Sequence, residues 1–116
     1  AEYWFKRRGW QMFKIEPPVK NLGPIPGKPG HFEAVYTDSG MPDFFGFRKA
    51  DNQAMFVEVK EARGKSCPAS RLSAEQRAFM AALPDCMRFT GILWDDCFEI
   101  FPFTPRGSYQ KGHGFK

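Results

Sequence analysis

Two short apolar segments separated by polar residues constrain the fold of this chain more than any other feature. Residues 43–47 and 54–58 both favour strands, and the stretch between them is polar with Asp and Asn at its tip, which is typical of a turn. We therefore predict an antiparallel hairpin. In its symmetric register Asp43 lies opposite Glu58, which places the two carboxylates at the open end with Cβ atoms about 5 Å apart.

Glu58 also shares a strand face with a cation. Side chains at positions i and i+2 leave the same face of a strand, so Glu58 and Lys60 project together. The apolar residues of the segment face the other way: Met55, Val57 and Val59. Because an unpaired charge is costly to bury, this arrangement needs a compensating partner. A divalent metal held by Asp43 and Glu58, with Lys60 beside it, supplies one.

Composition limits the class of protein. The chain has 116 residues, is 42% hydrophobic and contains 13 Phe, which indicates one domain with an aromatic core. No apolar run reaches the ~20 residues of a membrane span, and the N-terminal charges follow the apolar group, the reverse of a secretory signal. We expect no membrane partner. The net charge of +4 is equally consistent with a polyanionic partner and with an ordinary basic surface.

The three cysteines argue against two kinds of structural cross-link. Cys67, Cys86 and Cys97 are odd in number and lack C-x-x-C spacing, which argues against a disulfide framework and a structural zinc site. We therefore expect a protein of the reducing cytoplasm.

Turn and cap signals divide the rest of the chain. We expect a helix over residues 2–8 that stops at Gly9, and strands over 10–15, 31–36, 87–94 and 97–103. Residues 17–30 hold five prolines and three glycines, so we expect an extended arm there rather than core structure. The Gly-rich, basic tail from residue 104 to 116 is expected to be flexible, outside a single domain that covers residues 1–103.

A second helix is predicted after residue 72. Ser73 with Gln76 has the spacing of a capping box, and Pro84 ends the helix. An apolar stripe is expected to face the core: Ala78, Phe79, Ala82 and Leu83. The order of elements predicts an α+β fold, with a small central mixed sheet flanked by helices and carrying a protruding arm.

The motifs in this order resemble those of a nuclease superfamily. Pro42-Asp43 followed by Glu58-x-Lys60 is similar to the PD-(D/E)XK pattern, whose restriction-endonuclease-like α/β/α fold agrees with the fold predicted here. The flanking residues Gly40, Glu61, Lys65, Pro68, Leu72 and Gln76, with Gly9-Trp10 and the arm upstream, resemble RecU-type Holliday junction resolvases and their phage relatives. Gly-x-Pro-Asp, Val-Glu-Val-Lys and Leu-Ser-x-x-Gln are also shared with VRR-NUC domains.

The resemblance implies roles for particular residues. Asp43 and Glu58 would ligate Mg²⁺, with Mn²⁺ as a substitute, helped by the backbone carbonyl of Val59. Lys60 would polarise or orient the attacking water. Gln76 would lie near the metal or the scissile phosphate, and its capping role is the alternative. Relatives often add a Glu from the first helix, for which Glu2 is the candidate; otherwise Glu2 is a surface acid.

Basic residues before and after these motifs are candidates for contacts with DNA phosphates, which position a protein without reading sequence. They are Lys14, Lys20, Lys28, His31, Arg63, Lys65, Arg71 and Arg77.

We therefore predict a metal-dependent endonuclease selective for DNA structure, which resolves four-way junctions by paired nicks as a homodimer. It would act in the cytoplasm of a bacterium or of a phage host. A flap or junction nuclease of the VRR-NUC type, a nicking or restriction-type enzyme, and a non-catalytic DNA-binding protein on the same fold are the alternatives.

Overall fold

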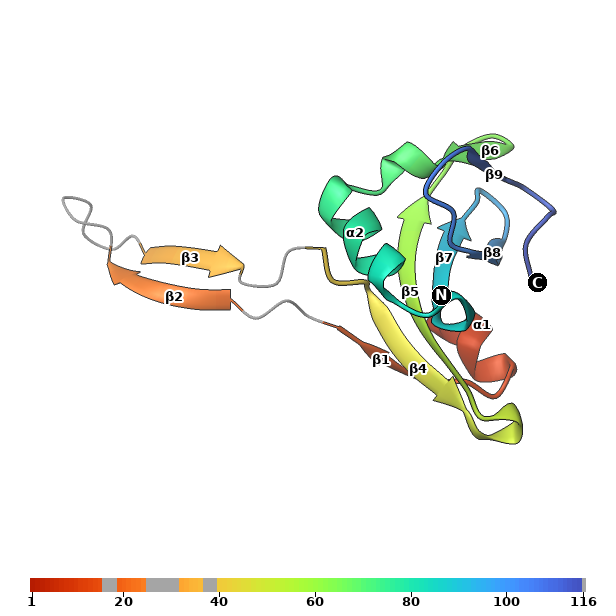
Figure 1. Ribbon diagram of the computed structural model, residues 1–116, viewed down its shortest axis with the longest axis horizontal. Helices are drawn as coiled ribbons and strands as arrows, with labels where there is room; N and C mark the ends of the chain where they lie inside the picture. Colours follow the sequence, from red (N-terminus) through yellow and green to blue (C-terminus); the bar gives the residue numbers. More distant parts are fainter. Residues whose placement is uncertain (16–18, 25–31, 37–39, 116) are drawn as a thin grey trace.

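A five-stranded mixed sheet lies between two helices in the computed structural model (Figure 1), which describes residues 1–15, 19–24, 32–36 and 40–115. The strand order is β1-β4-β5-β7-β8, in which β5 and β7 are parallel and the other neighbours antiparallel. The bounds are β1 (Gln11–Lys14), β4 (Phe44–Arg48), β5 (Gln53–Glu61), β7 (Arg88–Leu93), β8 (Phe98–Pro102), α1 (Glu2–Arg7) and α2 (Ala74–Ala82). This α+β architecture confirms the predicted fold class.

The β4–β5 hairpin has the predicted register. Phe45 pairs with Phe56 and Phe47 with Ala54. The turn contains a short 3-10 helix, η1 (Lys49–Asp51), followed by Asn52 in the left-handed conformation. Because Asn tolerates this conformation better than most residues, the polar tip closes the hairpin without strain.

Each face of the sheet carries its own core. On one face Phe5 of α1 packs with Met55, Val57 and Ile100. On the other, Met80 of α2 joins a larger cluster: Ala62, Cys67, Ala69, Leu72, Ile92, Trp94, Phe101, Phe103 and Tyr109. The two faces therefore stabilise the sheet independently, and the connection from β5 to β7 carries α2 across the second face. No helix in the described ranges is long and apolar enough to span a bilayer.

Helix α2 begins as predicted but buries a different face. Ser73 and Gln76 form a capping box, and the helix ends before Pro84. Met80 is its buried residue and Ala78 and Ala82 are exposed, so the predicted apolar stripe was wrong at these two alanines, whereas Phe79 contacts Phe56 and Leu83 packs against the core as expected. The side toward the sheet instead follows Gln76, Met80 and the partly buried Leu83, at the i, i+4, i+7 spacing of one helical face.

The Pro/Gly-rich arm contains regular structure, contrary to the expectation of an extended loop. β2 (Val19–Pro24) pairs antiparallel with β3 (Phe32–Tyr36), with a register shift between Asn21 and Gly23. Figure 1 shows this hairpin apart from the five-stranded sheet, which agrees with a protruding arm. The hairpin tolerates Pro24 because a two-stranded ribbon has outer edges that need no ladder hydrogen bond.

The chain after residue 103 is part of the fold, so the expected flexible tail was wrong for the described residues 104–115. β9 (Ser108–Gln110) pairs with β6 (Ser66–Pro68). Tyr109 is 3% exposed, and its hydroxyl lies 2.9 Å from Thr90 Oγ1. The Glu99 carboxylate accepts hydrogen bonds from the backbone N–H groups of Gly112 and Gly114. The tail is thus attached by a short strand pairing, by the buried Tyr109 and by a buried carboxylate.

We predict that Tyr109→Phe lowers the free energy of unfolding by about 1–2 kcal/mol, because it leaves the buried Thr90 hydroxyl without this partner. Urea denaturation measures the loss. Tyr3→Phe is the matched control, since Tyr3 is 71% exposed and its hydroxyl can bond to water. Equal stability of the two variants would contradict a structural role for the tail.

Candidate active site

Asp43 is fixed by hydrogen bonds to the chain on either side of β4. It immediately precedes β4, and its backbone carbonyl accepts a hydrogen bond of 2.7 Å from Ile15 N–H, just beyond β1. Its carboxylate accepts a hydrogen bond of 2.8 Å from Val59 N–H on β5. The side chain of Asp43 therefore accepts from the β5 backbone beyond the last paired residue of β4, which aims the carboxylate at β5.

A glycine lets the segment before Asp43 approach α2. Gly40 has φ +83°, and a Cβ placed on it would lie 2.6 Å from the backbone of Glu75 in the first turn of α2. Since an L side chain fits neither the dihedral nor the space, the Gly-x-Pro-Asp spacing reflects this contact. The contact brings residues 40–43 beside the start of α2 and so brings Asp43 close to Gln76.

Glu58 is the most deeply buried member of the site, with 3% of its surface exposed. Gln76 Nε2 donates a hydrogen bond of 3.0 Å to its Oε1, and Lys60 Nζ lies 3.8 Å from the same oxygen. The other oxygen, Oε2, is buried and has no hydrogen-bond partner within the described part of the chain. A buried carboxylate oxygen without a partner is costly, so this oxygen is a candidate ligand atom.

The electrostatics of the site agree with Glu58 as a candidate ligand of a cation. Burial, and after it the negative charge of the nearby Asp43 carboxylate, raise the pKa of Glu58 to about 8. Lys60 acts in the opposite direction. Two carboxylates that share so little solvent favour a bound cation, and oxygen donors of this kind suit hard ions such as Mg²⁺ or Mn²⁺.

Gln76 caps α2 and also contacts the buried acid, while its place near a metal or a scissile phosphate stays a prediction. Its Oε1 accepts a hydrogen bond from Ser73 N–H, which completes the capping box, while its Nε2 donates to Glu58. The two ends of one amide therefore connect the start of α2 to the buried acid. The structure brings Asp43, Glu58, Lys60 and Gln76 together.

Two other predicted ligands remain predictions. Val59 contributes its N–H to Asp43, and nothing further defines its carbonyl. Glu2 is exposed on α1 and lines a surface pocket with Lys14 and Phe44. Among the described residues, no group of three or more His, Cys, Asp and Glu side chains can hold a metal ion, so Glu2 does not complete such a group with Asp43 and Glu58.

Five of the eight predicted DNA-contact residues have side chains that the structure describes. Lys14, Arg63, Lys65 and Arg71 are exposed, and Arg77 on α2 is half-buried. Lys28 and His31 lie outside the described residues. Lys20 lies on β2, but its side chain is not among those described.

The family follows from a comparison with known domains. The VRR-NUC domain model matches residues 33–92, which is more than half of the chain and includes the whole candidate site. The chain belongs to the VRR-NUC domain family. VRR-NUC domains are PD-(D/E)XK-like nuclease domains, so the superfamily assignment made from the sequence is confirmed, and the matching family is the second of the two resemblances.

A solved structure supports the fold of this VRR-NUC domain independently. Hjc of Archaeoglobus fulgidus, described as a Holliday junction resolvase, superposes with a TM-score of 0.61 at 12% sequence identity, over 99% of this chain and 87% of that one. At this identity the likeness concerns the fold. The comparison with curated proteins gives no match.

We predict that Glu58→Gln stabilises the metal-free protein increasingly as pH rises from about 5 to 9. The folded protein keeps the Glu58 proton up to pH about 8, whereas the unfolded chain releases it near 4.5. Between these values the folded state binds more protons, so its stability falls as pH rises, and Gln removes this slope. The expected gain at pH 9 is about 1–3 kcal/mol.

Urea unfolding in EDTA at several pH values measures this difference. Glu75→Gln is the matched control because Glu75 is exposed in the first turn of α2. Parallel stability curves for Glu58→Gln and wild type would contradict the assigned environment of Glu58.

Proposed function

We propose that this VRR-NUC domain is an endonuclease that uses Mg²⁺, or Mn²⁺ in its place, to hydrolyse phosphodiester bonds in branched DNA, with four-way junctions as the main substrate. The observation that carries the proposal is the unpartnered, buried Oε2 of Glu58 beside the Asp43 carboxylate, with Lys60 3.8 Å from the other oxygen. A structural ion pair between Glu58 and Lys60 would explain neither the second acid nor the orphan oxygen.

The chain's own groups have separable tasks in this reaction. Asp43 and Glu58 would hold the cation, which when bound supplies Lewis acidity toward phosphate and water. The β5 backbone fixes Asp43, and Gln76 fixes Glu58, so both acids are oriented before substrate arrives. Lys60 adds positive charge where the phosphate gains negative charge and orients or polarises the attacking water.

The substrate class follows from the surroundings of the acids. Arg63, Lys65 and Arg71 are exposed on the part of the protein that follows β5. They can contact DNA phosphates, and such contacts do not read base sequence. Selectivity would then come from the geometry and deformability of a branch. The resolvase whose fold this chain shares supports a four-way junction, and the family match supports a flap or junction substrate as the second candidate.

We predict that Asp43→Asn reduces cutting at least about 100-fold while DNA binding is largely retained, since the change removes a metal ligand and no phosphate contact. The assay incubates a synthetic four-way junction, a flap and a linear duplex with Mg²⁺, Mn²⁺ or EDTA. Asp51→Asn is the control, because it removes a carboxylate at the exposed tip of the β4–β5 hairpin.

Paired symmetric nicks in the junction alone support a resolvase, and preferential flap cutting supports the second candidate. Binding without cutting in any metal would indicate a non-catalytic DNA-binding protein, and sequence-dependent cutting of the linear duplex would indicate a restriction-type enzyme. A normal cutting rate for Asp43→Asn would refute the site.

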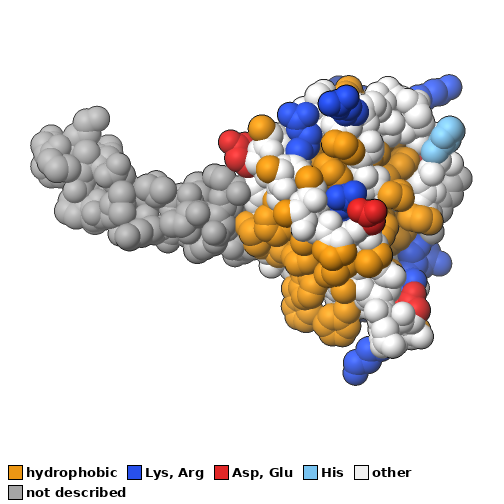
Figure 2. All heavy atoms as spheres, viewed as in Figure 1, with side chains coloured by type: hydrophobic (Ala, Val, Ile, Leu, Met, Phe, Trp, Pro, Cys, Tyr) orange, Lys and Arg blue, Asp and Glu red, His pale blue; other side chains and the backbone are white. Residues whose placement is uncertain are grey.

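We further propose that the enzyme is a homodimer, since two matched nicks in a nearly symmetric junction require two sites related by a two-fold axis. An aromatic patch on the same sheet face as the acids supports this, in which Phe13 contacts Phe47 and Phe56 contacts both Phe45 and Phe79. Phe13 is 49% and Phe47 36% exposed, and Figure 2 shows hydrophobic side chains gathered in this region. An exposed apolar cluster is typical of an interface.

We predict that Phe47→Ser converts the dimer to a monomer, because it removes an exposed ring of the patch together with its contact to Phe13. Light scattering after size-exclusion chromatography measures the mass. Phe115→Ser is the control, since Phe115 is 57% exposed but lies in the C-terminal segment that bridges β8. A wild-type monomer, or a dimer that both variants leave intact, would contradict this interface.

A further inference from the structure

A pocket of about 650 Å³ lies beyond the carboxyl ends of β5 and β7. Because these strands are parallel neighbours, the segments that leave them, residues 61–63 and 93–95, emerge side by side. Arg71, at the end of the 3-10 helix η2 (Ala69–Arg71), closes a third side. Ligands of open sheets commonly bind outside the carboxyl ends of parallel strands, so the position itself favours a binding function.

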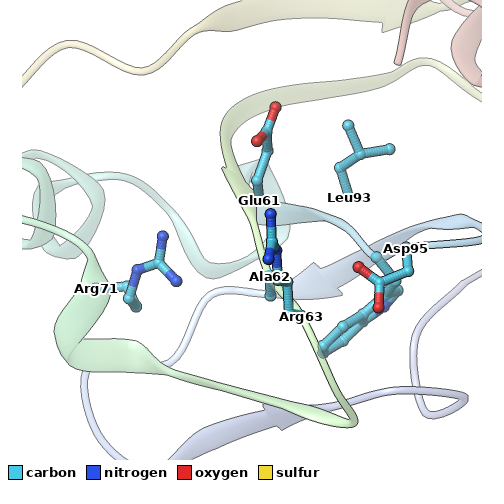
Figure 3. Close-up of a pocket in the computed structure, with 7 residues that line it drawn as sticks. Glu61, Ala62, Arg63, Arg71, Leu93 and Asp95 are labelled. Atoms are coloured by element: carbon cyan, nitrogen blue, oxygen red, sulfur yellow. The ribbon is translucent and has the colours of Figure 1, made fainter.

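Two guanidinium groups in this pocket are available to a ligand. Figure 3 shows Arg63 and Arg71 extending from different segments into the same space. Neither makes an ion pair or a side-chain hydrogen bond within the described residues. The cations in the ion pairs of that part of the chain are Arg48, Lys60, Arg88 and Lys111. Two arginines without acidic partners on converging segments are suited to an oxyanion such as phosphate.

Two carboxylates limit where an anion can sit. Glu61 and Asp95 also line the pocket, and Figure 3 shows Asp95 across from Arg71. A phosphate near either acid is repelled, so one position between the guanidiniums is favoured over a diffuse basic surface. The pocket is therefore expected to hold a single phosphate in a defined place.

The pocket is close to the acids along the same strand. From Glu58 to Glu61 is three residues of β5, or about 10 Å. Successive phosphates of one DNA strand rise about 3.4 Å along the helix axis and lie further apart than this because they also wind around it, so the distance corresponds to at most about two base steps. Burial raises the pKa of the Cys67 thiol, and the charges of Arg71 and Lys60 both lower it, so the two cations lie around one part of the fold.

We propose that Arg63 and Arg71 form a subsite for one backbone phosphate of the DNA, within about two base steps of the phosphate held at Asp43 and Glu58. The inference rests on the proposed function and deepens it, because it assigns the feature that positions the strand relative to the cut. Arg63 and Arg71 are positioning residues here, since they contact neither the reacting phosphate nor the metal ligands.

The test measures binding of a fluorescent four-way junction in EDTA, by anisotropy, over a range of salt concentrations. Arg71→Gln should weaken binding about 5- to 10-fold at low salt and reduce the slope of log K against log[salt] by about 1, the signature of one lost phosphate contact. Asp95→Asn should strengthen binding, because it removes a carboxylate that repels the phosphate. Lys49→Gln, at the opposite end of β5, is the matched control with an unchanged slope.

Location is tested with junctions in which one phosphate at a time is replaced by an uncharged methylphosphonate. One replacement within about two steps of the cut should weaken binding by the wild type as much as Arg71→Gln does, and Arg71→Gln should lose nothing further with that substrate. Additive losses at every position, or a slope equal to that of Lys49→Gln, would overturn the subsite. Absence of cutting in Mg²⁺ with these binding effects intact would instead overturn the proposed function alone.

Discussion

The burial of the Glu58 carboxylate beside Asp43 is the constraint on which the rest of the site depends. β5 is the strand that makes this burial possible, since it has β4 on one side and the parallel β7 on the other and is covered by α2. Glu58 lies in the inner part of this strand and is 3% exposed. The structure offsets part of the cost through Gln76 and Lys60 and leaves one oxygen unsatisfied, which is the state expected of a ligand that awaits its cation.

The elements around β5 each contribute one residue of the candidate site, as the proposed hydrolysis would require. The hairpin with β4 places Asp43 beside β5, the capped start of α2 carries the Gln76 amide, and β5 itself carries Lys60. The parallel pairing with β7 adds the pocket at the far end of the same strand. Acid pair and pocket thus lie along one rigid strand, so a DNA strand that contacts both is held at a fixed register relative to the acids.

Much of the fold and the site could be predicted from local signals. The register of the β4–β5 hairpin followed from alternation and a polar turn, and with it came the opposition of Asp43 and Glu58. The capping box of α2 was equally readable, because Ser73 and Gln76 interact within one turn. The buried face of α2 was not, because Ala78 and Ala82 fit an apolar stripe as well as Met80 does. The tail was misjudged for a related reason: one of its attachments is a carboxylate thirteen residues upstream, Glu99, which accepts from its backbone.

What the sequence determined by itself is the set of interactions between residues close along the chain: the strand alternation, the hairpin turn, the helix cap, and through them the pairing of two acids with a lysine on one face. Tertiary structure alone decided the second bond of Gln76, the unsatisfied oxygen of Glu58, the close approach of Gly40 to α2 and the meeting of Arg63 with Arg71. The physical reason is that period and turn chemistry act over a few residues, whereas desolvation and convergence depend on which distant segments the packed sheet brings together.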